Sequence, residues 1–198
     1  MAVLTLIASA IAGSPSGAAP AGAVPPVSTK AHAAGLIDVR TVVPDAIVDL
    51  RYASAHNFTG VRLYPADARC LVHRTMARGL RTAADRLRRA GYLLVFWDCY
   101  RPHSVQVRMY KIVPNPAWVA RPGPYAYSHE AGRSVDVTLV RTSGAACTPA
   151  RRIAGHCPVV MGTGFDNFTP RAYAYATAGV SPRAEGDRVK ASPLARRL

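Results

Sequence analysis

The segment between Leu71 and Asp98 constrains the fold most, because it combines a helical pattern with a buried strand. Apolar or small residues recur near a 3.6-residue period at positions 72, 76, 80, 83, 84 and 87, with arginines between them, which predicts a helix over residues 71–90. Gly91 is expected to end this helix. The continuous apolar run YLLVFWD, residues 92–98, is typical of a strand that is covered on both faces. The chain is therefore expected to contain both helices and a sheet.

The rest of the pattern favours a single α+β domain with a central, largely antiparallel sheet flanked by helices. Residues 37–54 predict extended segments broken at Pro44, and residues 104–113 predict a short helix that ends before Pro114. The alternating run RSVDVTLV, residues 133–140, predicts a strand with Val135, Val137 and Leu139 on one face and Ser134, Asp136 and Thr138 on the other. Because no repeating βαβ pattern is visible in the sequence, a parallel sheet is not expected.

Length and composition predict one domain behind an export signal. The chain has 198 residues, of which 49% are hydrophobic, which is enough for one core within residues 29–198. Residues 1–28 form an apolar and then low-complexity leader, with A-x-A cleavage sequences at 8–10 and 21–23 but no Lys or Arg before the apolar run. This leader is too short and too interrupted by Gly and Pro to span a membrane. We therefore expect a secreted or cell-envelope protein.

The four cysteines fit disulfide bonds in an exported protein. Three pairings are possible, and two bonds are favoured: Cys147 with Cys157, across a short polar loop, and Cys70 with Cys99, between a predicted helix start and the strand that follows it. The alternative is four free, buried cysteines. The sequence contains no C-x-x-C pair, so a zinc-ribbon or thioredoxin-type site is not supported.

The net charge of +14 comes almost entirely from arginine. Such a charge can indicate a nucleic-acid partner. The arginines are spread over the whole chain, however, and no known nucleic-acid-binding motif accompanies them. We therefore expect no nucleic-acid partner and a solvated basic surface suited to an anionic cell envelope. An unrelated basic binding module is the alternative.

A histidine and an aspartate stand seven residues apart in the stretch YSHEAGRSVDVTLV, residues 127–140. His129 precedes the predicted strand and Asp136 lies on it. Both residue types are zinc ligands, and a catalytic zinc usually has three protein ligands and one water. The spacing alone is weak evidence, because a loop histidine and a capping aspartate often produce it.

Further motifs accompany this pair in a fixed order between residues 38 and 180. They are VDLRYAS with NFTG, then FWDCYRP, SHEAGRSVD and MGTGFDNF. SHEAGRSVD matches the zinc motif S-H-x-x-G-x-x-x-D, and FWDCYRP matches the strand-end motif D-x-Y-R-P. The sequence thereby resembles the D-alanyl-D-alanine dipeptidases, a branch of the zinc D,D-peptidases.

The resemblance implies zinc-dependent hydrolysis of the D-alanyl-D-alanine dipeptide, in cell-wall metabolism or glycopeptide resistance. It implies that His129 and Asp136 are zinc ligands. It also implies that Arg101 stabilises the oxyanion that develops on the peptide carbonyl, a role that suits a permanently charged guanidinium. Asp98 is placed to orient Arg101.

The resemblance places Tyr52 and Asp166 near the ammonium or carboxylate of the dipeptide. By residue preference alone, Tyr52 could equally fill the core and Asp166 could be a turn residue.

One family motif is not found in the 198 residues. In the family, an E-x-x-H motif near the C-terminus supplies the third zinc ligand and the general base. Here neither Glu130 nor Glu185 has a histidine three positions later, and the spacing of His103 and His156 does not suggest a substitute ligand. We therefore expect a C-terminally truncated domain with weak zinc binding and impaired activity. The alternative is a noncatalytic envelope protein that binds D-alanyl peptide termini.

Overall fold

The computed structural model describes residues 24–187 except 145, 174, 177 and 186. Most of the predicted leader therefore lies outside the described residues. The described elements, in chain order, are α1 (Thr29–Ala33), β1 (Leu36–Asp38), η1 (Val39–Thr41), β2 (Ile47–Val48), η2 (Arg51–Ala53), β3 (Leu71–His73), η3 (Arg74–Met76), α2 (Ala77–Arg89), β4 (Tyr92–Asp98), α3 (His103–Ile112), η4 (Ser128–Ala131), β5 (Asp136–Arg141), η5 (Pro149–Arg151), β6 (Cys157–Pro158) and η6 (Pro170–Ala172). The elements named η are 3₁₀ helices.

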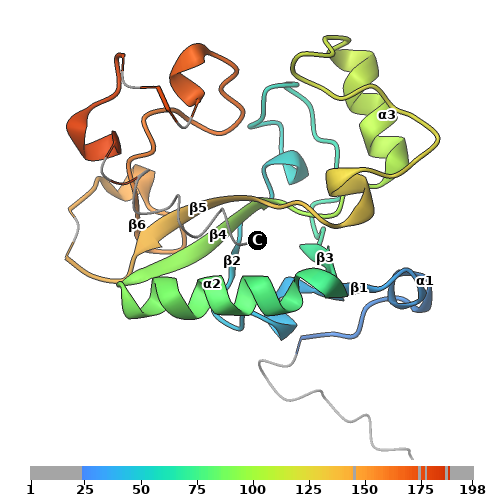
Figure 1. Cartoon of the computed structure of the whole chain (residues 1–198), viewed down its shortest axis with the longest axis horizontal. Coiled ribbons are helices and arrows are strands. Elements are labelled where there is room, and N and C mark those ends of the chain that lie inside the picture. The colour runs from blue at the N-terminus through green and yellow to red at the C-terminus, as the bar shows by residue number, and fades with distance from the viewer. Residues whose placement is uncertain (1–23, 145, 174, 177, 186, 188–198) are drawn as a thin grey trace, which may run out of the picture.

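The strands form two sheets. The larger sheet has the order β2-β4-β5-β6, in which β2 is parallel to β4 and the other pairs are antiparallel. The smaller sheet pairs β1 with β3 in the antiparallel sense. Figure 1 shows α2 along one side of the larger sheet, and α3 and the loops after β5 on the other. The predicted α+β fold with a largely antiparallel sheet is confirmed.

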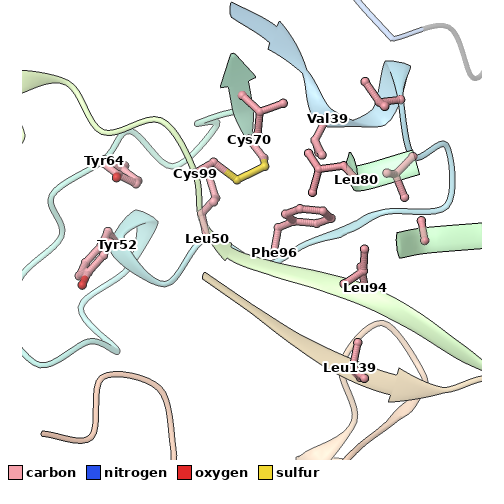
Figure 2. Close-up of a cluster of buried hydrophobic side chains, with 14 of the residues drawn as sticks. Val39, Leu50, Tyr52, Tyr64, Cys70, Leu80, Leu94, Phe96, Cys99 and Leu139 are labelled. Carbon is pink, nitrogen blue, oxygen red and sulfur yellow. A yellow bond between two sulfur atoms is a disulfide. The ribbon is translucent and has the colours of Figure 1, made fainter. Parts of the chain in front are cut away.

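The core lies between α2 and the larger sheet. Leu80, Ala84 and Leu87 of α2 belong to the same buried cluster as Leu94 and Phe96 of β4, in agreement with the predicted helical period. Figure 2 shows the middle of this cluster and the two tyrosines, Tyr52 and Tyr64, that extend it to one side.

The predicted start of the helix at residue 71 is wrong. Residues Leu71–His73 form strand β3, because they pair with β1, and α2 begins only at Ala77. The side chain of His73 accepts a hydrogen bond from the Thr75 backbone N–H, which starts the 3₁₀ turn between strand and helix.

The other local predictions agree with the structure to within a few residues. The predicted short helix is α3. The predicted alternating strand is β5, which begins at Asp136, and Thr138 is as buried as Leu139 on the opposite face. Within the predicted extended region, only β1 and β2 are strands, with 3₁₀ turns after each.

Both favoured disulfide pairings, Cys70–Cys99 and Cys147–Cys157, are present in the structure. The first bond joins the residue before β3 to the residue after β4, and not a helix start to a strand as expected (Figure 2).

In the described part of the chain, no helix has the length and apolar character needed to cross a membrane.

Candidate active site

Three elements bring the predicted site residues together. Asp98 is the last residue of β4 and Asp136 is the first residue of β5. The two residues pair with each other, after a register shift in β4 between Phe96 and Asp98. His129 lies on η4. Ligand atoms of Asp98, His129 and Asp136 all lie within 4.8 Å of one another. The structure therefore assembles the predicted pair, His129 and Asp136, and adds a second carboxylate beside it.

The turn that carries His129 is fixed on both sides. The Arg101 backbone N–H donates to the His129 carbonyl at 3.0 Å, and the His73 backbone N–H donates to the Gly132 carbonyl at 2.7 Å. Gly132 ends η4 in the left-handed region with φ 64°, which glycine adopts without strain. A Cβ at this position would lie 2.7 Å from Leu36 Cδ2. The glycine of the zinc motif is thus needed both for its φ and for its lack of a side chain.

The hydrogen bonds of His129 orient its ring. Nδ1 lies 2.9 Å from the carbonyl oxygen of Cys99, which can only accept, so Nδ1 carries the proton. Nε2 faces Asp136 Oδ1 at 3.4 Å, so a proton or a metal ion can lie between these two atoms. Burial disfavours a charged imidazole, but the carboxylates of Asp136 and Asp98 together raise the pKa of His129 above its ordinary value.

Asp98 lies at the base of the site and is hydrogen-bonded on both carboxylate oxygens. Its Oδ1 accepts hydrogen bonds from the Tyr64 hydroxyl at 2.6 Å and from the Cys99 backbone N–H at 2.8 Å. Its Oδ2 accepts from Arg101 Nη2 at 2.6 Å, and the side chain is 0% exposed. Oδ1 therefore accepts two hydrogen bonds and Oδ2 accepts one from Arg101, so the expected orienting contact between Asp98 and Arg101 is present.

Arg101 is held in a buried setting beside the carboxylate. Its Nη2 binds Asp98, its Nη1 donates to Gln106 Oε1 at 2.7 Å, and its guanidinium carbon lies 5.3 Å from the centre of the Tyr52 ring. Burial alone would lower the pKa of Arg101, but Asp98 and the neighbouring tyrosines raise it above its ordinary value, so the side chain stays cationic. The Nε–H is buried, and no partner is found for it among the described residues.

Tyr52 and Asp166 meet although they are 114 residues apart. The Tyr52 hydroxyl donates to Asp166 Oδ2 at 2.5 Å, and Phe165 packs edge-on against the Tyr52 ring. Burial raises the pKa of Asp166 to about 6, and the charge of Asp136 contributes to the shift. Tyr52 also belongs to the core, and Asp166 lies in a turn with φ 50°, as residue preference alone suggested. The predicted contact of both residues with the dipeptide stays a prediction.

Sequence reasoning missed Gln106 and Tyr64. Gln106 lies on α3 and is 3% exposed, and Tyr64 lies in the loop before β3. A glutamine one helical turn beyond Arg101-Pro102 was visible in the sequence, but the partners of its amide were not.

His103 binds Glu130 at 2.6 Å and His156 lies in the turn before β6, so neither belongs to the described metal-binding group.

The donor set fits zinc. A neutral imidazole Nε2 next to a carboxylate is a common pair of zinc ligands, and a histidine ligand usually donates its other N–H to a carbonyl or carboxylate. His129 meets both conditions through Asp136 and the Cys99 carbonyl. Asp98 lies just behind the ring, with Oδ2 3.5 Å from Nδ1.

Comparison with known proteins agrees with this geometry. A family model described as D-ala-D-ala dipeptidase matches residues 32–194. The D-alanyl-D-alanine dipeptidase of Escherichia coli (strain K12) is 30% identical over 154 residues, which cover 78% of this chain and 72% of that protein. The family model spans every site residue described above. The chain belongs to the D-Ala-D-Ala dipeptidase family of peptidases.

Proposed function

We propose that this protein is a zinc-dependent dipeptidase that hydrolyses D-alanyl-D-alanine. The observation that carries the proposal is the pair His129 Nε2 and Asp136 Oδ1, 3.4 Å apart, next to the buried cation of Arg101. The dipeptide itself is proposed from the family and from the name of the Escherichia coli relative.

In this proposal His129 and Asp136 hold the metal. Bound zinc would polarise the peptide carbonyl and make water more acidic. The Cys99 carbonyl keeps Nδ1 protonated, so that Nε2 stays available as a ligand. Because the pKa of His129 is raised by Asp136 and Asp98 against the effect of burial, protons compete with the metal at this nitrogen.

Arg101 is proposed to stabilise the negative charge that develops on the carbonyl oxygen. The guanidinium is cationic, 11% exposed and held by Asp98 and Gln106, so it would need little reorganisation during the reaction. Removing a donor of this kind typically lowers kcat by about 10² to 10³ fold.

Tyr52 and Asp166 are proposed to bind the free ammonium of the dipeptide. Asp166 is half-buried, and above its pKa of about 6, which burial raises, it carries the charge that an ammonium group requires. The Tyr52 hydroxyl fixes one carboxylate oxygen and leaves the other for the ligand.

The number of available metal ligands determines the zinc affinity and the activity that we expect. The described metal-binding group consists of Asp98, His129 and Asp136, and Asp98 already accepts hydrogen bonds on both oxygens, so His129 and Asp136 are the proposed metal ligands. We propose that the 198-residue chain binds zinc more weakly than a three-ligand site and has impaired activity. The second candidate is a noncatalytic envelope protein that binds D-alanyl termini, and it would use Arg101, Tyr52 and Asp166 without the metal chemistry.

We also propose an extracytoplasmic location. The two disulfides support it, because structural disulfides are typical of proteins outside the cytosol.

Metal analysis and calorimetry test the proposed function. The protein is expected to bind zinc after dialysis and, in its presence, D-alanyl-D-alanine in preference to L-alanyl-L-alanine. His129→Ala should abolish zinc binding, whereas His56→Ala, at an exposed histidine outside the described metal-binding group, should not. Stoichiometric zinc retained by His129→Ala would overturn the metal assignment. Binding of D-alanyl-D-alanine without turnover would favour the noncatalytic alternative, and binding of neither dipeptide would refute both.

A further inference from the structure

We propose that Gln106 is a positioning residue that sets the orientation of the Arg101 guanidinium. The proposal rests on the proposed role of Arg101, but it adds a residue that the motifs of the family did not indicate. Gln106 lies on the first turn of α3 and is 3% exposed. A buried glutamine requires partners for both ends of its amide.

The contacts of the Gln106 amide leave only one orientation. Its Nε2 donates to the Ala120 carbonyl oxygen at 2.6 Å, and its Oε1 accepts from Arg101 Nη1 at 2.7 Å. A carbonyl oxygen cannot donate and a guanidinium cannot accept, so exchanging the amide oxygen and nitrogen would break both bonds. The backbone at Ala120 therefore fixes the amide, and the amide fixes Arg101.

Gln106 and Asp98 hold opposite corners of the guanidinium. Asp98, at the end of β4, binds Nη2, and Gln106 binds Nη1 from α3. Rotation about the Cζ–Nε bond would have to break both contacts before the two nitrogens could exchange places. The plane of the guanidinium is thus defined by two separate elements, with the Tyr52 ring against it. The remaining N–H groups point in fixed directions.

The neutral charge of the amide matters as much as its shape. Asp98 already places one negative charge next to the Arg101 guanidinium. A second carboxylate at position 106 would offset the positive charge that the reaction uses, and it would face the Ala120 carbonyl without a donor. Glutamine orients the cation and leaves its charge available.

Two variants separate orientation from charge. Gln106→Met keeps the volume of the side chain and removes both hydrogen bonds, while Gln106→Glu keeps an acceptor and adds a charge. Val107→Ala, an exposed position on the same helix, is the control for a general effect on α3. Unfolding midpoints of all variants show whether the fold is kept.

The first readout is the nitrogen spectrum of the arginine side chains, which needs no activity. The Arg101 Nη signals are those lost in Arg101→Lys. In the unsubstituted protein we expect two separate Nη signals, because rotation about Cζ–Nε is hindered. In Gln106→Met these signals should merge, and in Val107→Ala they should not. Separate, unchanged Nη signals in Gln106→Met would overturn the proposal.

The second readout is a double-mutant cycle on the zinc-loaded protein. Gln106→Met is expected to lower kcat for D-alanyl-D-alanine by about 10 to 100 fold with KM nearly unchanged, because orientation matters most in the transition state. In the Arg101→Lys background the same change should have no further effect. An equal loss in both backgrounds would show that Gln106 acts elsewhere and would refute the proposal. If the unsubstituted protein has no turnover, the enzymatic function fails, and the Nη spectrum alone decides whether Gln106 orients Arg101.

Discussion

Asp38 and Asp98 are the two most deeply buried aspartates among the described residues, and arginines compensate their charges in different ways. Asp38, 1% exposed, is bound by Arg40 at 2.9 Å and by Arg69 at 2.8 Å, and these two guanidiniums are 39% and 27% exposed. Asp98, 0% exposed, is bound by Arg101, which is only 11% exposed. The first arrangement anchors the N-terminal strand at the surface. The second keeps a cation inside the site, where it can act on a ligand.

Asp38 should control part of the acid stability. Burial would raise the pKa of Asp38, but the hydrogen bonds from Arg40 and Arg69 outweigh it and lower the pKa below its ordinary value. An acid with a lowered folded-state pKa contributes stability above its unfolded pKa, near 3.9, and loses it as the pH falls through the folded value. Asp38→Asn should therefore cost about 3 kcal/mol at neutral pH and almost nothing in strong acid.

Urea unfolding at several pH values measures this difference. Asp45→Asn is the matched control, because Asp45 pairs with Arg88 at an exposed position and should contribute less than about 1 kcal/mol. A constant cost of Asp38→Asn from pH 2 to 7 would contradict the assignment.

At the scale of the elements, the site depends on how closely η4 approaches β1 and β3. A Cβ on Gly132 would lie 2.7 Å from Leu36 Cδ2 and 3.1 Å from the His73 backbone nitrogen. Gly60 has nearly the same φ, 69° against 64°, but its Cβ would meet nothing within 4 Å. The two glycines therefore separate the cost of the backbone conformation from the cost of the contact.

Gly132→Ala should destabilise the protein by about 3 kcal/mol, and Gly60→Ala by only about 1 kcal/mol, since only the first substitution adds overpacking to backbone strain. Thermal unfolding compares the two. Zinc affinity should also fall in Gly132→Ala alone, because His129 lies on the displaced turn. Equal losses of stability in both variants would show that the space around Gly132 can relax.

The local sequence pattern was sufficient to predict the elements in which the apolar pattern extends over many residues. The helical period that includes Leu80 and Leu87 and the apolar run of β4 both predicted the core correctly. Strand β3 was missed because it has only three residues and is specified by its pairing with β1, more than thirty residues earlier. Gln106 was missed for a similar reason, since its partner Ala120 reaches it only through the tertiary fold.

The site residues were predicted from ordered motifs and not from periodicity. The spacing of His129 and Asp136 could not show that a turn and a strand end would bring them together. The contact between Tyr52 and Asp166 joins distant parts of the chain, so no local pattern could reveal it. The resemblance of the motifs supplied what local physics could not, namely which distant segments meet.

At the scale of the whole molecule, the Cys70–Cys99 bond ties the smaller sheet to the larger one beside the site. Replacing both cysteines by serine should cost about 3 to 4 kcal/mol, and replacing Cys147 and Cys157 about 3 kcal/mol, by loop-closure entropy. The two effects on stability are similar. Their effects on the site should differ, because only Cys99 touches it.

Zinc affinity separates the two disulfides. The Cys70→Ser/Cys99→Ser variant should bind zinc about 10 to 100 fold more weakly, as when an outer partner of a ligand is lost. The Cys147→Ser/Cys157→Ser variant should retain its affinity. Calorimetric titration measures both, and equal affinities would contradict the expected difference.

From the position of Cys99 we expect the site to be sensitive to redox state. Its backbone N–H binds Asp98 and its carbonyl binds His129, while its sulfur is bonded to Cys70. In a reducing environment Cys99 would no longer be bonded to Cys70, and its backbone would hold Asp98 and His129 in place less firmly. The protein could then remain folded through its hydrophobic core and still lack a well-ordered metal centre. Oxidation, and not folding alone, would complete the site.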